Sequence, residues 1–200
     1  MRLQDCKCNY CTKNGWPLLW VLPNGDSWYE IPKNGSWTIK STFTRKLKRF
    51  RKHQDYPDSI KEKPTLIVWR DPIERFESLF KHYMIKQGIR YKLTEKYFQR
   101  QGIPLAKIPV DDRLKLMMDH IEHFSSLEEV HHFYPQTNFI DQKRIQNFKI
   151  LPLEELTSYL KVPVKNRTKS DYSLILPDHI RDEVKEYYAD DYTFYEKHMK

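Results

Sequence analysis

The chain has 200 residues, a length that suits one domain with a substantial core. Its 35 lysines and arginines against 27 aspartates and glutamates give a net charge of +8, which favours anionic partners such as a phosphorylated small molecule, an acidic glycan or nucleic acid. No window approaches the roughly 20 apolar residues of a membrane span, and no signal-peptide core follows the N-terminus, so we expect a soluble protein.

Residues 1–26 are interpreted as an N-terminal arm and residues 27–200 as a single domain. The arm holds Cys6, Cys8 and Cys11, the three cysteines of the chain, so the core has no disulfide framework. A structural zinc site normally needs four ligands, and no nearby histidine supplies the last. We therefore expect a reduced or variably oxidised arm and no metal, with zinc as the alternative that stays open.

Pro23-Asn24-Gly25 predicts a turn ahead of a first strand near Ser27–Ile31. The segment that follows is amphipathic and predicts a helix from Ser36 to about Lys52. The basic run Arg45–Lys52 continues this helix. Such a run usually forms a solvated helix face, and steering of a donor or glycan and contact with a nucleic-acid backbone are the alternatives.

The loop between this strand and helix has the residue types of an anion site. Gly35 lets the backbone turn closely around a ligand, Ser36 and Thr38 add hydroxyl groups, and Lys33 adds a cation. The first N–H groups of a helix lack intrahelical acceptors and attract phosphate or sulfate. The lysine precedes the glycine, so the loop is not a Walker A motif. An ordinary turn with Ser36 as N-cap is the alternative.

A second strand is predicted at Thr65–Trp69, an apolar, β-branched run that Pro64 bounds. Pro72 suits the first turn of a helix, and an apolar stripe then recurs at helical spacing: Ile73, Phe76, Leu79, Phe80 and Tyr83. Arg70 therefore stands at a strand end, and Ser78 lies two turns into the next helix. An arginine fork beside a hydroxyl group suits a phosphate monoester, and an arginine paired with Asp71 is the alternative.

Strands and helices alternate along the rest of the chain, which predicts an α/β fold. We expect a helix at 111–124, short strands at 139–140 and 148–151, a helix that starts at 152–156, a loop at 166–168 and a last helix from Pro177.

Two segments resemble the sulfotransferases that use 3′-phosphoadenosine 5′-phosphosulfate, with the carbohydrate sulfotransferase branch as the nearest match. Pro32–Thr38 is similar to their 5′-phosphosulfate loop, and Val68–Ser78 to their 3′-phosphate segment. His132–Gln136 and Tyr187–Tyr195 are similar to two further elements of that branch, so the resemblance covers residues 27–197. It implies this phosphosulfate as sulfuryl donor, no required metal, and a P-loop-like α/β sandwich around a central parallel sheet.

The resemblance also implies residue roles. The donor-binding residues would be Lys33, Asn34, Gly35, Ser36, Trp37, Thr38, Arg70, Ser78, Arg167 and Thr168. Lys33 would stabilise the leaving phosphate, and Trp37 departs from the small or hydroxylated residue of the family loop. His132 is the first choice for the base that takes the acceptor proton, with acceptor binding as an equal alternative, and His53 is its rival.

From this we expect transfer of a sulfuryl group to a hydroxyl group, on a carbohydrate acceptor. A small-molecule kinase and a basic nucleic-acid-binding module are the alternatives. Golgi members of the family carry a membrane anchor before the catalytic domain. We therefore expect either a cytoplasmic microbial or viral relative, which the short length favours, or an excised Golgi lumenal domain.

Overall fold

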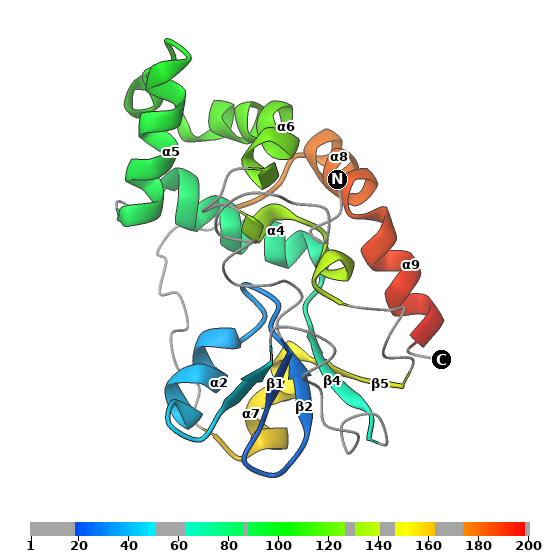
Figure 1. Cartoon of the computed structure of the whole chain (residues 1–200). Helices are drawn as coiled ribbons and strands as arrows, with labels where there is room; N and C mark the ends of the chain where they lie inside the picture. Colours follow the sequence, from blue (N-terminus) through cyan, green and yellow to red (C-terminus); the bar gives the residue numbers. More distant parts are fainter. Residues whose placement is uncertain are drawn as a thin grey trace.

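The computed structural model describes residues 19–50, 63–85, 88–126, 131–140, 147–162 and 174–198. Within these ranges five strands form one sheet in the order β3-β1-β2-β4-β5 (Figure 1). The strands are β1 (Leu19–Val21), β2 (Ser27–Tyr29), β3 (Lys48–Phe50), β4 (Thr65–Trp69) and β5 (Phe148–Pro152). The strands β2, β4 and β5 are parallel, whereas β1 runs antiparallel to β2 and β3. The α/β class is confirmed, and the sheet is mixed, which corrects the expected parallel sheet.

A tight turn explains the antiparallel pair of β1 and β2. The N–H of Leu22 donates to the carbonyl of Asp26 over 2.8 Å, and the N–H of Gly25 donates to the carbonyl of Leu22 over 2.9 Å. Gly25 takes a φ of 86°, which glycine adopts without steric cost. The predicted turn is thus confirmed, and residues 19–21 of the expected arm pair with the sheet.

Helices cover both faces of the sheet. On one face lie α2 (Ser36–Phe43) and α7 (Leu156–Leu160), and on the other α9 (Ala189–His198). Successive residues of β4 point to opposite faces. Leu66 joins a buried cluster with Ile39 of α2 and Leu156 of α7, whereas Trp69 stacks on Phe194 of α9 with ring centroids 5.5 Å apart. Both faces of the predicted strand are therefore buried, as its continuous apolar run indicates.

A second group of helices lies above the sheet in Figure 1. It consists of α4 (Pro72–Phe80), which a π-helical turn (Lys81–Ile85) extends, α5 (Ile89–Arg100), α6 (Val110–Ser126) and α8 (Asp178–Tyr187). The carboxylate of Asp71 caps α4 by accepting the N–H of Glu74 over 3.0 Å, and Pro72 follows it. The apolar stripe predicted for this helix is buried in the core that these helices share.

Short 3₁₀ turns occupy Leu105–Lys107, His131–Phe133, Gln136–Phe139 and Leu153–Glu155. The helix expected at 111–124, the strand at 148–151, the helix from 152–156 and the helix after Pro177 are all present. No helix of the described ranges is long and apolar enough to span a membrane.

The expected helix from Ser36 to Lys52 was wrong in its second half. The helix ends at Phe43, where the hydroxyl of Thr44 donates to the carbonyl of Lys40 over 2.7 Å. Pairing with β1 then draws residues 48–50 into β3, and the guanidinium of Arg49 lies 5.7 Å from the centre of the Trp20 ring. The described part of the basic run therefore lies on a turn and an edge strand, not on a helix face.

The strand expected at Phe139–Ile140 was also wrong, because residues 136–139 form a 3₁₀ turn. Asp191 of α9 explains the difference. Its carboxylate accepts the N–H groups of Gln136 over 2.8 Å and Thr137 over 3.0 Å, which fixes the start of the turn. No sequence pattern near residues 136–139 predicts that the distant Asp191 caps this turn.

We predict that the helical layer depends on Phe76, which is fully buried and stacks on Phe80. Phe76→Ala should lower the free energy of unfolding by about 3–5 kcal/mol because the cavity adds to the lost burial. Lys92→Ala, at an exposed position of α5, should change it by less than about 0.5 kcal/mol. Urea unfolding measures both, and equal midpoints for the two variants would contradict the buried position of Phe76.

Candidate functional site

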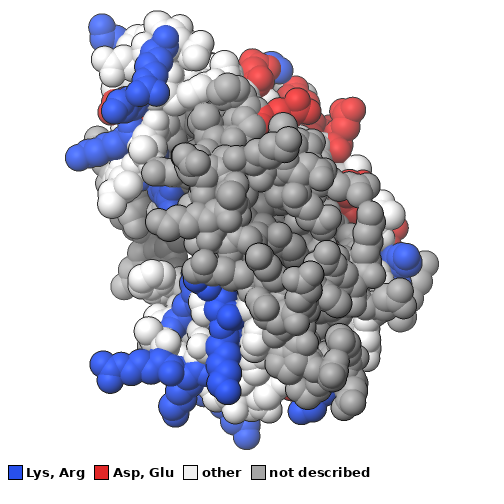
Figure 2. Space-filling model, viewed as in Figure 1, with Lys and Arg blue, Asp and Glu red and all other residues white. Residues whose placement is uncertain are grey.

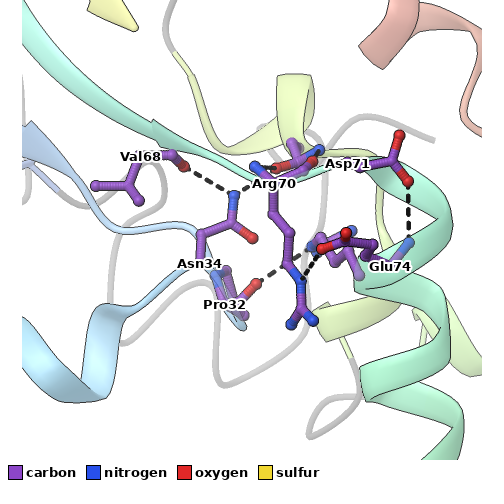
Figure 3. Close-up of polar contacts among 8 residues, drawn as sticks. Pro32, Asn34, Val68, Arg70, Asp71 and Glu74 are labelled. Atoms are coloured by element: carbon purple, nitrogen blue, oxygen red, sulfur yellow. Dashed lines mark hydrogen bonds and ion pairs between the residues drawn. The ribbon is translucent and has the colours of Figure 1, made fainter. Parts of the chain in front are cut away.

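The carboxyl ends of the parallel strands bring three segments together. The loop after β2 lies against the end of β4, because the side-chain Nδ2 of Asn34 donates to the carbonyl of Val68 over 2.8 Å (Figure 3). It also lies against the segment after β5, because a Cβ on Gly35 would overlap the Leu156 side chain and come within 3.0 Å of Leu153. The two predicted anion-binding segments are thus neighbours at one edge of the sheet.

The loop has an unusual backbone. Lys33 and Gly35 both take positive φ angles, 70° and 73°. Glycine adopts this conformation freely, whereas a residue with a Cβ pays about 1–2 kcal/mol for it. Helix α2 then begins at Ser36, with Gly35 as N-cap and no side-chain cap, so Ser36 is not the N-cap of the alternative interpretation. The first N–H groups of α2 lack intrahelical acceptors and carry the positive end of the helix dipole.

Arg70 follows β4 and is half-buried. Its Nε lies 3.6 Å from a carboxylate oxygen of Glu74, and no described residue pairs with its Nη groups. Figure 3 shows its side chain running past Asn34 toward Pro32 and Glu74. Burial lowers the pKa of Arg70 and the Glu74 charge opposes this, so the guanidinium stays charged at neutral pH. The arginine can present a charged fork beside the loop.

Gln136 joins the loop after β2 to the end of β4. Its side chain is fully buried, and its Oε1 accepts from the Nδ2 of Asn34 and from the N–H of Arg70 over 3.2 Å. Its Nε2 donates to the carbonyl of Arg70 over 2.9 Å and to the carboxylate of Asp191 over 3.3 Å. One amide group therefore contacts the loop, the end of β4 and the last helix.

The buried carboxylate of Asp191 receives four hydrogen bonds. Gln136 supplies two, and Thr137 adds its N–H and its hydroxyl over 3.0 and 3.1 Å. Burial raises the pKa of Asp191 above its usual value, although the nearby Arg75 charge and these donors oppose the shift. The two oxygens of an ionised carboxylate can accept all four hydrogen bonds. The O–H of a protonated Asp191 would find only donors around it and no acceptor.

Arg75 is a third fully buried polar residue. Its guanidinium donates to the carbonyls of Pro32 over 3.2 Å, Tyr134 over 2.9 Å and His132 over 2.6 Å. It thereby fixes the entry of the loop against the segment that carries Gln136. Sequence reasoning placed Arg75 off the apolar stripe of α4, which was wrong because the residue is fully buried; it gave no role to Asp191 and named Gln136 only as part of a motif. The signal for Arg75 was its spacing, because it stands three residues after Pro72 and four before Leu79, at the margin of that stripe.

His132 lies close to the loop. Its Nδ1 is 3.1 Å from the hydroxyl of Tyr83. Burial lowers the pKa of His132 well below its usual value near 6.5, and the charges of Arg90, Arg75 and Lys33 lower it further. The imidazole is therefore neutral at pH 7. Arg75 bonds the carbonyls of both Pro32 and His132, so His132 lies near the start of the loop.

The structure gives fewer contacts for the other residues that the sequence predicted for this site. Ser78 is half-buried on α4, and no described contact joins it to Arg70. Trp37 is 60% exposed in the first turn of α2. The predictions for His53, Arg167, Thr168, Cys6, Cys8 and Cys11 lie outside the described residues. In the described ranges no three histidine, cysteine, aspartate or glutamate side chains gather as metal ligands.

Charge is unevenly distributed over the surface. Figure 2 shows lysine and arginine side chains gathered over the part of the molecule that holds α2 and β3, and acidic side chains over the region of α8. The exposed basic residues of this part include Arg45, Lys46, Lys48 and Arg49. Arg45 and Lys46 follow the C-terminal end of α2, and Lys48 pairs with Val21 at the end of the sheet opposite to the loop. The net charge of +8 favours anionic partners in general.

In comparisons with known proteins, no family model, no curated protein and no solved structure matches the chain.

We predict that Gly35→Ala destabilises the protein more than Gly102→Ala. Both glycines have a positive φ, 73° and 77°, so each alanine costs about 1–2 kcal/mol in backbone strain. A Cβ at Gly102 meets nothing within 4 Å, whereas a Cβ at Gly35 overlaps Leu156 and adds about 1–3 kcal/mol. Urea unfolding of both variants measures the difference, and equal losses would show that the loop does not pack against α7.

We also predict that the folded protein loses stability through His132 as the pH falls below about 6.5. The pKa of His132 is depressed in the folded state, so the unfolded chain binds the extra proton first and the free energy of unfolding decreases. The loss is at most about 1.4 kcal/mol per pH unit. Urea unfolding from pH 7.5 to 5 should show a smaller loss for His132→Gln than for the wild type. Identical pH profiles would contradict the prediction.

Proposed function

We propose that this protein is a sulfotransferase that moves a sulfuryl group from 3′-phosphoadenosine 5′-phosphosulfate to an acceptor hydroxyl, on a carbohydrate. The observation that carries the proposal is the hydrogen-bonded junction of Asn34, Gln136 and Arg70, which sets a cationic loop at a helix N-terminus beside an arginine fork. A donor with a phosphosulfate at one end and a separate phosphate at the other needs two such anion sites.

The phosphosulfate would bind at the N-terminus of α2, where the helix supplies N–H groups and Ser36 and Thr38 supply hydroxyl groups. Lys33 would neutralise the charge that develops on the leaving phosphate. The 3′-phosphate would bind the Nη groups of Arg70, with Ser78 as a further hydroxyl. No step of this scheme requires a metal ion, because protein cations hold the negative charge.

The acceptor hydroxyl must lose a proton during an in-line transfer, and His132 supports this role. A neutral imidazole can take that proton. If Nδ1–H donates to the hydroxyl oxygen of Tyr83, the lone pair lies on Nε2, to which no described residue hydrogen-bonds. Burial, with the neighbouring cations, lowers the pKa of His132, so the resting imidazole is neutral and its lone pair is available.

The two alternatives have less support from the geometry. A kinase that uses nucleoside triphosphate would hold its phosphates with a Walker A loop, and the Gly-x4-Gly-Lys-Ser/Thr spacing is absent from Pro32–Thr38. A nucleic-acid-binding module would use the basic run, but Lys48 and Arg49 lie on the edge strand β3, where charged side chains also serve to prevent strand pairing with other molecules.

We predict that the wild type binds 3′-phosphoadenosine 5′-phosphate, the desulfated donor, and that Arg70→Ala weakens this binding about tenfold or more. Isothermal titration calorimetry without metal measures both. Arg100→Ala, at the exposed end of α5, should leave the affinity unchanged. No binding by the folded wild type, or equal binding by Arg70→Ala, would contradict the proposed donor site.

Measurements of turnover separate a catalytic role of Lys33 from a role in binding the donor. With labelled phosphosulfate and a panel of hydroxylated carbohydrates, Lys33→Ala should lower kcat about 10²–10³-fold, since the lysine acts on charge that develops in the transition state. The kinase alternative would instead show transfer from ATP with magnesium. Full donor-dependent activity in Lys33→Ala would exclude this catalytic role.

A further inference from the structure

The conformation of the donor loop is unfavourable by itself. Lys33 holds a left-handed backbone, which a residue with a Cβ rarely adopts. The Oδ1 of Asn34 is buried, and no described residue hydrogen-bonds to it. A buried acceptor without a partner destabilises a structure, so neither feature forms spontaneously in a free loop. Other contacts must impose this conformation.

The contacts that impose it converge on the Nδ2 of Asn34. This group donates to the carbonyl of Val68 and to the Oε1 of Gln136. The same Oε1 accepts the N–H of Arg70, and the Nε2 of Gln136 donates to the Arg70 carbonyl. Gln136 therefore fixes the distance between the loop and the backbone that carries the Arg70 fork.

Gln136 is itself held from the C-terminal helix. The carboxylate of Asp191 accepts both the main-chain N–H and the side-chain Nε2 of Gln136, so the amide cannot rotate without losing a partner. Thr137 donates twice to the same carboxylate and fixes its rotamer. A rigid chain of hydrogen bonds thus runs from α9 to the loop.

We propose that Gln136 is the positioning residue of the donor site and that Asp191 holds it in place. Gln136 sets the spacing between the phosphosulfate loop and Arg70 and so matches the site to a ligand with anions at both ends. The inference deepens the proposed function and rests on it for the ligand, but the positioning of the loop is measurable without any ligand.

The test compares Gln136→Met, which keeps the side-chain length and removes the hydrogen bonds of the side chain, with Thr65→Val. Thr65 is a matched control, since its buried hydroxyl bonds the hydroxyl of Ser27 over 2.8 Å at the start of β4, the end of the strand away from the loop. Hydrogen exchange of the ligand-free protein reports the loop through the bonded amides of Asn34 and Ile39. Calorimetry with 3′-phosphoadenosine 5′-phosphate reports the site.

We expect exchange of these two amides to accelerate at least tenfold in Gln136→Met and less than twofold in Thr65→Val. We also expect Gln136→Met to weaken nucleotide affinity at least tenfold and to raise the donor KM with little change in kcat. Asp191→Asn should give the same pattern, because its amide would place N–H groups against donors. If Gln136→Met does not fold, Thr137→Val serves as a milder variant, with a two- to fivefold acceleration.

Unchanged exchange in the folded Gln136→Met, or in Thr137→Val where it is used, would overturn the inference, and so would equal acceleration in Thr65→Val. The failure of the proposed function looks different. In that case the wild type does not bind the nucleotide, and the exchange comparison alone decides whether Gln136 positions the loop.

Discussion

A buried amide or carboxylate is stable in a protein interior only where partners replace the water that it loses. Gln136 and Asp191 are both fully buried, and each meets this condition through the other and through the backbone of a neighbouring segment. Moving either side chain would leave several donors or acceptors unpaired. The end of β4, the turn after Pro135 and the last helix therefore behave as one hydrogen-bonded unit, and the candidate site is built on it.

Arg75 supplies the opposite charge to this unit. Its guanidinium is buried and bonded to three backbone carbonyls, and its positive charge opposes the effect of burial on the pKa of Asp191. Removal of a buried charge that satisfies several partners leaves these partners without a donor, which destabilises far more than a surface ion pair can stabilise. The three bonds of Arg75 thus link α4 to the segment His132–Tyr134 and keep the carbonyl of Pro32, at the start of the loop, in a fixed place.

Local patterns were sufficient for the elements that bury a continuous apolar surface. The strand Thr65–Trp69 and the stripe from Ile73 to Tyr83 follow from side-chain chemistry within one segment, and the structure has both. Residues 48–50 show where such patterns fail. Lysine and arginine carry no strand signal, and this strand exists because β1 offers it a partner. Likewise the turn at 136–139 exists because Asp191 caps it, 55 positions away from Gln136.

The same distinction applies to the site. Lys33, Gly35 and Arg70 were predictable because cations and glycine at strand ends signal anion binding within a few residues. Asn34 was predicted to bind the donor, which stays a prediction, and the structure adds that its Nδ2 holds the loop to β4, across 34 positions to Val68 and 102 to Gln136. The sequence does not distinguish a buried polar residue from an exposed one, so these contacts could not be predicted from the neighbouring residues. Sequence therefore identifies the groups that would bind the ligand, whereas the packing of the last helix determines how far apart they lie.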